Sequence, residues 1–375
     1  MKKIMITLLI FSLACCSLSC ANANSDKEQT TADSSQNEST TTLTDMAGRT
    51  VEIPTEIERI VPLGNTPRMV AYLGLADQVV GISEFKEATT SPLQAYAYVN
   101  KDLWSDLPIV GSSVLGSTDY YPEALMATNA DIIFCTYSKE QADDIQRQTG
   151  IPVVAVADAT AFGDDYDASL RMLGDICGVS SRAEALITYI DTCLEDLNAR
   201  TASISPTDNP SVLAAAATYK GVHGIDWVYT DYPVFNTIHA NNLAQNLTTD
   251  ALATMVDKEQ ILTWNPDYIF LDSSGVSLVQ DAFNKSPDYF NNLHAFTSDQ
   301  IYQYPNAVKY DTNLEISLVN SYYVGKILFP DQFKDIDFET EANAIFNFFL
   351  GSDDYLSVLE ADGSGYAKVE LGDPS

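Results

Sequence analysis

The sequence feature that most constrains the fold is an alternation of short apolar runs with helical stretches, which begins near Thr44. The apolar runs are rich in Ile and Val, as buried strands are. They cover residues 60–63, 79–82, 109–110, 132–135 and 153–156. Helical stretches lie between them and begin, for instance, after Pro67 and Pro122. This alternation predicts an α/β fold with mainly parallel sheets covered by helices.

A long amphipathic helix divides the alternation into two halves. It is expected over residues 180–204, where apolar residues recur every three or four positions. These residues are Ala183, Leu186, Ile187, Ile190, Cys193, Leu194 and Leu197. The second strand–helix series covers residues 212–216, 268–271, 301–304, 313–328 and 339–350. We therefore expect two α/β lobes joined by one long helix.

The two halves contain a similar segment. Glu, Asn, Asp, Ile and Phe recur at the same spacing in residues 123–134 and 259–270, 136 positions apart. Any helix–turn–strand unit can converge on such a pattern, but both copies occupy the same place in their halves, which favours a duplication. In an open parallel sheet, ligands bind at the carboxyl ends of the strands. Two facing lobes therefore predict a ligand cleft between them.

The N-terminal residues have the pattern of an export signal. Two lysines precede an apolar run over residues 4–14, which is too short to span a bilayer of about 30 Å. In a bacterial lipoprotein signal, small residues precede a Cys that becomes diacylated and then, on cleavage, N-terminal. We expect lipidation at Cys20, with Cys15 and Cys16 as alternatives, and a plain secretory signal as the other interpretation.

Composition separates a further N-terminal segment from the folded chain. Residues 21–43 are almost entirely small and polar, so we expect a disordered tether. The other expected boundaries are a signal peptide at 1–20, a first lobe at 44–179, the linking helix at 180–204, a second lobe at 205–350 and a tail at 351–375. In the tail, residues 362–365 suggest the turn of a small hairpin.

Charge and cysteine content exclude several classes of protein. The chain has 52 acidic and 20 basic residues and a net charge of −32, which argues against nucleic acid and against an anionic membrane surface. Three cysteines follow the signal: Cys135, Cys177 and Cys193. We expect free buried thiols, with a Cys177–Cys193 disulfide as the alternative.

Several segments together resemble a known family. They include residues 45–54 (DMAGRTVEIP), 59–61 (RIV), 73–81 (LGLADQVVG), 108–111 (PIVG), both Glu-to-Asp segments and 328–333 (LFPDQF). The combination resembles the helical-backbone (class III) substrate-binding lipoproteins of ABC importers, which serve ferric siderophores, haem and cobalamin. The resemblance covers residues 44–350. It implies two Rossmann-like lobes with mainly parallel sheets, joined by one long α-helix, with a ligand cleft between the lobes.

Loops after the expected strands supply the candidate ligand-binding residues. In the first lobe these are Asn65, Thr66, Arg68, Lys86, Ser112 and Tyr137. In the second lobe they are Tyr219, Lys220, Trp227, Asp272, Lys309 and Tyr310. The four cations among them would pair with an anionic chelate, and an ordinary surface salt bridge is the alternative for each. An aromatic loop with His223, Trp227, Tyr229 and Tyr232 either stacks on a flat ligand or packs the lobe.

A receptor for a bare metal ion and an enzyme are both disfavoured. A Zn or Mn receptor needs several His and carboxylate ligands from both lobes, but the chain has three His residues, all in its second half: His223, His239 and His294. Gly-x-Ser-x-Gly, His-Glu-x-x-His and Cys-x-x-Cys motifs are missing from the sequence, as is a Gly-rich phosphate loop. We expect no resident metal or cofactor, and an extracytoplasmic enzyme or a surface adhesin is less favoured.

The resemblance also implies partners. In the family, one exposed Glu per lobe meets arginines on the two permease subunits, which implies Glu123 and Glu259 here. The alternative is that each carboxylate only stabilises the first turn of its helix. We expect a lipid-anchored, extracytoplasmic monomer that captures an iron(III) chelate of the siderophore type and delivers it to an ABC permease dimer and its ATPase. Cobalamin or another corrinoid, haem, and an oxyanion such as molybdate are the alternative ligands.

Overall fold

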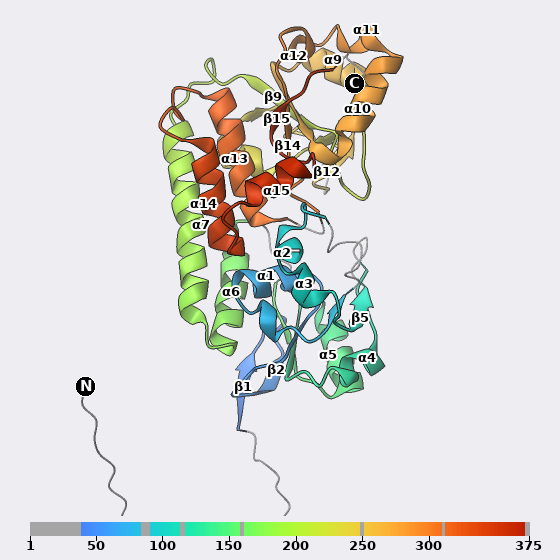
Figure 1. The fold of residues 1–375 in the computed structure, drawn as a ribbon, viewed down its shortest axis with the longest axis vertical. Coiled ribbons are helices and arrows are strands. Elements are labelled where there is room, and N and C mark those ends of the chain that lie inside the picture. Colours follow the sequence, from blue (N-terminus) through green and yellow to red (C-terminus); the bar gives the residue numbers. More distant parts are fainter. Residues whose placement is uncertain are drawn as a thin grey trace, which may run out of the picture. The chain divides into compact units, whose positions relative to one another are not determined.

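The computed structural model describes residues 39–83, 91–112, 117–157, 161–247, 251–309 and 312–371. This part of the chain forms two α/β lobes joined by a long helix (Figure 1). The expected signal peptide, which contains Cys15, Cys16 and Cys20, and most of the expected tether lie outside the described residues, as do Lys86 and Tyr310.

A two-stranded hairpin opens the first lobe. Strand β1 (Thr40–Thr44) pairs antiparallel with β2 (Thr50–Pro54). Strand β1 therefore occupies the end of the segment that we expected to be a tether. Its threonines are β-branched, and Val51 and Ile53 of its partner strand are buried, so strand pairing orders a stretch whose composition alone indicates disorder.

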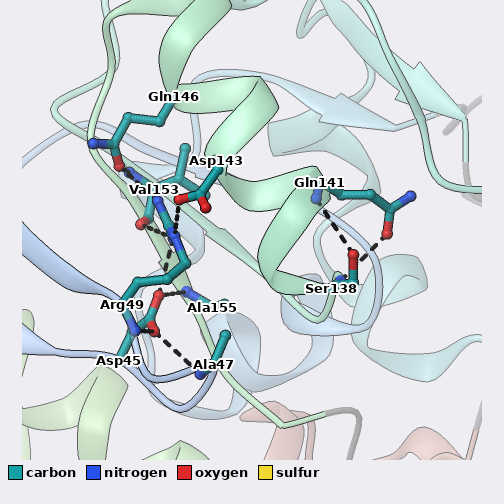
Figure 2. Close-up of polar contacts among 9 residues, drawn as sticks. All are labelled: Asp45, Ala47, Arg49, Ser138, Gln141, Asp143, Gln146, Val153 and Ala155. Atoms are coloured by element: carbon teal, nitrogen blue, oxygen red, sulfur yellow. Dashed lines mark hydrogen bonds and ion pairs between the residues drawn. The ribbon is translucent and has the colours of Figure 1, made fainter.

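Buried charges tie the turn of this hairpin to the rest of the lobe, as Figure 2 shows. The Asp45 carboxylate accepts hydrogen bonds from the Arg49 guanidinium at 2.9 Å and from the Ala155 main-chain N at 3.1 Å. Arg49 Nη1 also donates to the Val153 carbonyl at 2.7 Å, and its other nitrogens donate to two side chains of α5 (Lys139–Thr149). Both charged residues are buried. The DMAGR signature therefore has a structural role at this position.

The first lobe contains two short sheets. Strands β3 (Ile60–Pro62), β7 (Ile132–Cys135) and β8 (Val153–Ala155) are parallel. Strands β4 (Ile82–Ser83) and β5 (Ile109–Ser112) are parallel, and β6 (Asp119–Tyr120) pairs antiparallel with β5. A bridge between Ile60 and Val79 connects the two sheets. The strands predicted in this half are therefore present, with 79–82 reduced to this bridge and the start of β4.

Helices separate these strands, as the alternation predicts. They are α1 (Thr66–Tyr72), α2 (Ala95–Val99), α3 (Lys101–Trp104), α4 (Pro122–Ala127), α5 and α6 (Asp164–Ile176), with the short 3-10 helix η1 (Ala76–Gln78).

The predicted long helix is α7 (Ser180–Thr201). It packs on α6 of the first lobe and on α13 (Leu314–Leu328) of the second lobe (Figure 1). Its buried residues include Leu186, Ile190 and Leu197, as the three-to-four spacing predicts. No helix within the described residues is both long enough and apolar enough to span a membrane.

The second lobe is built on one seven-stranded sheet. Its strands run in the order β12 (Ala253–Met255), β10 (Trp227–Tyr229), β9 (Ser211–Ala215), β13 (Tyr268–Asp272), β14 (Ile301–Tyr304) and β15 (Ala367–Lys368), with β11 (Asn241–Asn242) also paired to β9. Strands β9, β11, β13 and β14 are parallel where they pair. The outer strands β12, β10 and β15 pair antiparallel.

In the second lobe, the two longest helices, α13 and α14 (Phe338–Leu350), lie between β14 and β15. The other helices are α8 (Pro233–Asn236), α9 (Lys258–Trp264), α10 (Val276–Lys285), α11 (Pro287–Phe290), α12 (His294–Thr297) and α15 (Tyr355–Ala361), with the 3-10 helix η4 (Ser273–Gly275). Cys135, Cys177 and Cys193 are free thiols, so the alternative of a Cys177–Cys193 disulfide does not apply.

The tail does not form the hairpin expected at residues 362–365. Helix α15 ends there, and Gly363 has a φ of 77°, a left-handed conformation that favours glycine. The chain then joins the sheet edge as β15, antiparallel to β14. The Gly-rich turn therefore ends a helix instead of connecting two strands of one hairpin.

Candidate functional site

Loops at the ends of the parallel strands hold most of the predicted ligand-binding residues. In the first lobe these are Asn65 and Thr66 after β3, Ser112 at the end of β5, and Tyr137 after β7. In the second lobe these are Tyr219 and Lys220 after β9, Asp272 at the end of β13, and Lys309 after β14. Trp227 begins β10, which pairs antiparallel with the end of β9.

Neutral polar atoms without a hydrogen-bond partner gather at these strand ends. Within the described residues they include Ser83 Oγ, Tyr137 Oη, Thr218 Oγ1, Ser273 Oγ and Asn306 Nδ2, all buried. We call these five residues the strand-end set. They follow or end β4, β7, β9, β13 and β14, so both lobes contribute. Leaving such a group unpaired costs about 1–3 kcal/mol, so these atoms are candidates for hydrogen bonds to a ligand.

Tyr137 is held in place by the loop after β3. Gly64 has a φ of +63°, and a Cβ at this position would lie 3.0 Å from Tyr137 Cε1 and collide with Thr136 Oγ1. The same Thr136 oxygen accepts a hydrogen bond from the Asn65 main-chain N at 3.1 Å. Burial raises the pKa of Tyr137 to about 12, so its phenol is a neutral hydrogen-bond donor at physiological pH.

Asp272 positions the strand ends of the second lobe. Its carboxylate accepts hydrogen bonds from Tyr229 Oη at 2.9 Å, from the Thr218 main-chain N at 3.1 Å and from the Ser274 main-chain N at 3.0 Å. The residue is fully buried, and burial raises its pKa to about 6. These contacts make Asp272 a positioning residue that orders the loops after β9 and β13, which carry Thr218 and Ser273.

The aromatic loop divides into two pairs with different environments. The His223 and Trp227 rings stack with centroids 3.8 Å apart, and both residues are half-buried. His223 Nε2 also lies 2.9 Å from the carbonyl oxygen of Tyr219. Tyr229 and Tyr232 are both buried and stack at 4.5 Å. The second pair therefore packs the lobe, and only the first pair remains as a candidate surface for a flat ligand.

Arg68 lies in the junction between the lobes. Its side chain is buried, and its Nε donates a hydrogen bond to Asn313 Oδ1, 3.3 Å away, directly before α13 of the second lobe. Its guanidinium also lies 5.0 Å from the centroid of the Tyr96 ring. We predicted either a ligand contact or a surface salt bridge. The buried contact with Asn313, a residue distant in sequence, does not fit a surface salt bridge, and the ligand contact stays a prediction.

Further buried contacts cross the same junction. Tyr72 Oη of α1 donates a hydrogen bond to Glu315 Oε2 of α13. Arg182 of α7 donates to the Tyr72 carbonyl at 2.9 Å and to a carbonyl of α14 at 2.6 Å. Burial raises the pKa of Glu315, whose other oxygen has no partner within the described residues. We call Arg68, Tyr72, Arg182, Asn313 and Glu315 the lobe junction.

Three further predicted residues of the first lobe, Asn65, Thr66 and Ser112, are buried or half-buried. Thr66 is fully buried, and its hydroxyl donates to the carbonyls of Leu63 at 2.9 Å and Phe134 at 3.2 Å. Its side chain therefore stabilises the start of α1 and is not directed at a ligand. Asn65 is half-buried before α1, and Ser112 is buried at the end of β5.

The lysines of the second lobe differ in exposure. Lys220 is exposed, has a φ of 55°, and its Nζ lies 5.2 Å from the Tyr219 ring centroid. Lys309 is half-buried after β14, and its carbonyl accepts a hydrogen bond from Asn313 Nδ2 at 3.2 Å. The predicted ligand-binding residues did not include Ser83, Thr218 or Ser273, because hydrogen-bond satisfaction is not visible in a sequence.

Glu123 and Glu259 occupy matching places in the two lobes. Both are exposed and lie in the first turn of a helix, α4 and α9 respectively. Each helix follows an antiparallel outer strand, β6 or β12, and leads into a parallel strand, β7 or β13.

The repeat extends to the turns that follow these helices. Asn129 and Asn265 both adopt left-handed conformations, with φ values of 50° and 45°. Asp131 accepts a hydrogen bond from the main-chain N directly before β3, and Asp267 accepts one from the first main-chain N of β9. The Glu-to-Asp segments are therefore the same structural unit in each lobe.

No group of three or more His, Cys, Asp or Glu residues within the described ranges could hold a metal ion.

Comparisons with known proteins identify the family. The model of the periplasmic binding protein family matches residues 64–308. A relative from Bacillus subtilis (strain 168), described as an uncharacterized ABC transporter substrate-binding lipoprotein, YvrC, is 26 % identical over 300 residues, covering 78 % of this chain and 87 % of the relative.

Solved structures share the fold. A periplasmic solute binding protein from Veillonella parvula aligns with a TM-score of 0.67 and 21 % identity, covering 84 % of this chain and 94 % of that chain. The molybdate periplasmic binding protein MolA of Haemophilus influenzae aligns with a TM-score of 0.65 and 19 % identity, covering 83 % and 98 % respectively. Since the family model spans well over half of the sequence, the chain belongs to the periplasmic binding protein family, whose members bind substrates for ABC transporters and are not enzymes.

Proposed function

We propose that this protein captures an iron(III) chelate of the siderophore type outside the cytoplasm and delivers it to an ABC permease. The observation that carries the proposal is the strand-end set, which brings unpaired hydroxyl and amide donors to the strand ends of both lobes. A chelate presents several oxygen acceptors on opposite sides of one metal ion. Donors from two lobes match that distribution.

The chemistry of these donors favours a ligand of low charge. The atoms in the strand-end set are neutral, whereas Arg68, which we expected to face the ligand, contacts Asn313. A highly charged anion needs ionised partners to offset its desolvation. We therefore favour an iron complex whose net charge is close to zero, such as a ferric trihydroxamate, and the metal arrives inside its organic ligand.

Titrations of the purified protein test this proposal. Native mass spectrometry first identifies any molecule that copurifies, and quenching of tryptophan fluorescence then measures affinity for ferric trihydroxamate and ferric catecholate chelates, cobalamin, haem and molybdate. Trp227 is a half-buried reporter beside the strand ends of the second lobe. We expect the ferric trihydroxamate to bind most tightly. Tighter binding of molybdate, haem or cobalamin would show that this molecule, and not the iron chelate, is the substrate.

Glu123 and Glu259 are our proposed contacts with the two permease subunits. A pseudo-symmetric pair of exposed carboxylates suits a two-fold partner, because each lobe presents the same charge to one subunit. Glu123→Arg and Glu259→Arg should each reduce transport while leaving chelate affinity and melting temperature nearly unchanged. Normal import by both variants would leave the carboxylates with only the helix-dipole role.

Anchoring through an acylated cysteine completes the proposal. The B. subtilis relative is described as a lipoprotein, and Cys20 is our preferred modification site. Cys20→Ala should move the protein from the membrane fraction to the soluble fraction. Continued membrane association would transfer the assignment to Cys15 or Cys16.

A further inference from the structure

Exposed apolar side chains accompany both proposed docking glutamates. Six large apolar residues in the described ranges are strongly exposed: Leu103, Tyr121, Met126, Val222, Met255 and Leu278. Tyr121 and Met126 lie within three residues of Glu123, and Met255 lies four residues before Glu259. Three of these six exposed apolar residues therefore lie within four positions of Glu123 or Glu259 in the sequence.

In the first lobe, the glutamate and an apolar side chain share one helix face. Glu123 and Met126 are three residues apart on α4, so they lie on the same side of the helix. Met126 is 45 % exposed, whereas Leu125 is fully buried. Tyr121, directly before the helix, is 42 % exposed although its main-chain N is bound to the Val110 carbonyl at 2.9 Å. The backbone is therefore fixed while the apolar side chains face solvent.

In the second lobe, the apolar side chain lies at the edge of the sheet. Met255 is the last residue of the outer strand β12 and is 62 % exposed. It pairs directly with Trp227 of β10, so the two side chains lie on the same face of the sheet. Trp227 in turn stacks on His223. Met255 therefore continues the surface of Trp227 and His223 toward the sheet edge, four positions before Glu259 in the sequence.

The two arrangements occupy the same structural unit. Tyr121 follows the outer strand β6 and directly precedes α4, whereas Met255 ends the outer strand β12, three residues before α9 begins. An exposed apolar residue usually has no special meaning when it is isolated. Here, exposed apolar residues lie within four positions of the glutamate in both copies of the repeat, although at different positions of the repeated unit, which points to one partner that contacts both lobes.

We propose that Tyr121 with Met126, and Met255, are apolar anchors that insert into recesses on the two permease subunits, each recess lying beside a cation that meets the glutamate. The inference rests on the proposed transport function. Buried apolar anchors supply most of the affinity of a protein interface, whereas exposed charge pairs mainly set orientation and association rate. The glutamates would then orient the complex, and the apolar anchors would hold it.

The test compares anchor variants with equally exposed apolar residues elsewhere. Met126→Ala, Met255→Ala and Tyr121→Ala are measured beside Leu103→Ala and Leu278→Ala, which are 48 % and 41 % exposed in the parent protein. Affinity for the permease–ATPase complex in nanodiscs is the main measurement. Each anchor variant should bind about 5–30-fold more weakly, equivalent to about 1–2 kcal/mol. The controls should change affinity by less than twofold, and every variant should keep its chelate affinity and melting temperature.

Other outcomes would overturn the inference in distinguishable ways. If the anchor variants bind the permease as tightly as the wild type does, while Glu123→Arg and Glu259→Arg bind it more weakly, the anchors are rejected and the docking glutamates stand. Unchanged affinity in both groups would reject this docking surface altogether. Loss of chelate binding would place the anchors in the ligand site. The wild-type protein could also sediment as a dimer that Met126→Ala or Met255→Ala makes monomeric. That result would mean that the surface binds a second copy of this chain.

Discussion

The lobe junction and the strand-end set both contain buried polar side chains, but the two differ in chemistry and in pairing. Most residues of the junction are ionisable, and each has a partner in the other lobe or in the linking helix, as in the Arg68–Asn313 and Tyr72–Glu315 contacts, although Glu315 Oε1 has no partner within the described residues. The strand-end set contains neutral hydroxyl and amide groups, such as those of Tyr137 and Asn306, whose named atoms have no partner in the described chain. We infer that the paired groups hold the framework and that the unpaired groups await a ligand.

The largest expected effect concerns the buried ion pair of Asp45 and Arg49 in the first lobe, which lies outside the lobe junction. Asp45→Ala removes the carboxylate that contacts the buried Arg49 guanidinium, and it should lower the free energy of unfolding by about 3–5 kcal/mol. Asp143→Ala is the matched control, because Asp143 also contacts Arg49 but its side chain is 56 % exposed. The control should lose less than about 1 kcal/mol in denaturant unfolding. A large loss of chelate affinity in folded Asp45→Ala would contradict the division between framework and ligand site.

Asp272 should make the free energy of unfolding depend on pH, and the expected change is nearly as large. Burial raises its pKa from 3.8 to about 6, so the folded state holds this proton more tightly than the unfolded state. Its contribution to stability is therefore greatest below pH 4 and decreases as the pH rises to about 6, by about 3 kcal/mol at most. Denaturant unfolding from pH 4 to pH 7, compared with Asp272→Asn, measures this contribution. A contribution that rises with pH would mean that the three hydrogen bonds to the carboxylate outweigh its desolvation.

Arg68→Ala distinguishes the junction from the ligand site. The change removes the hydrogen bond to Asn313 and the contact with the Tyr96 ring, and it should lower the free energy of unfolding by about 1.5–3 kcal/mol. Affinity for a ferric trihydroxamate should stay within twofold of the wild type in fluorescence titrations. A weaker affinity with unchanged stability would return Arg68 to the anionic-ligand role that its sequence position suggests.

The smallest expected effect is the change of shape on ligand binding. The single linking helix α7 and the junction contacts leave few backbone torsions free to open and close the lobes. Solution scattering with and without the ferric trihydroxamate should therefore give nearly the same radius of gyration. A change of several ångströms would show that the junction contacts break during binding.

Local sequence patterns predicted most of the fold. The strand–helix alternation located the parallel strands, the three-to-four spacing located α7, and the Glu-to-Asp segments located the repeated unit with its left-handed Asn129 and Asn265. Each of these features depends on residues close together in the chain. Strand β15 had no such signal, because its two residues are exposed and its pairing with β14 depends on the path of the tail.

The candidate site was less predictable because it depends on partners distant in sequence. Arg68 and Asn313 are 245 positions apart, so no local pattern indicates that one contacts the other. Ser83 and Ser273 resemble any other serine until the structure shows that their hydroxyl oxygens are buried without a partner among the described residues. The predicted ligand-binding residues therefore include Tyr137 but not Ser83 or Ser273, whose role depends on what surrounds them.

The most direct test of the central claim makes the same chemical change in both regions. Tyr72→Phe removes a paired phenol of the lobe junction, and Tyr137→Phe removes an unpaired phenol of the strand-end set. Tyr72→Phe should lower the free energy of unfolding by about 1–3 kcal/mol and leave the affinity for a ferric trihydroxamate unchanged. Tyr137→Phe should keep or raise the stability of the ligand-free protein and weaken that affinity by about 0.5–1.5 kcal/mol. Equal losses of stability in the two variants, with no change in affinity, would contradict the account.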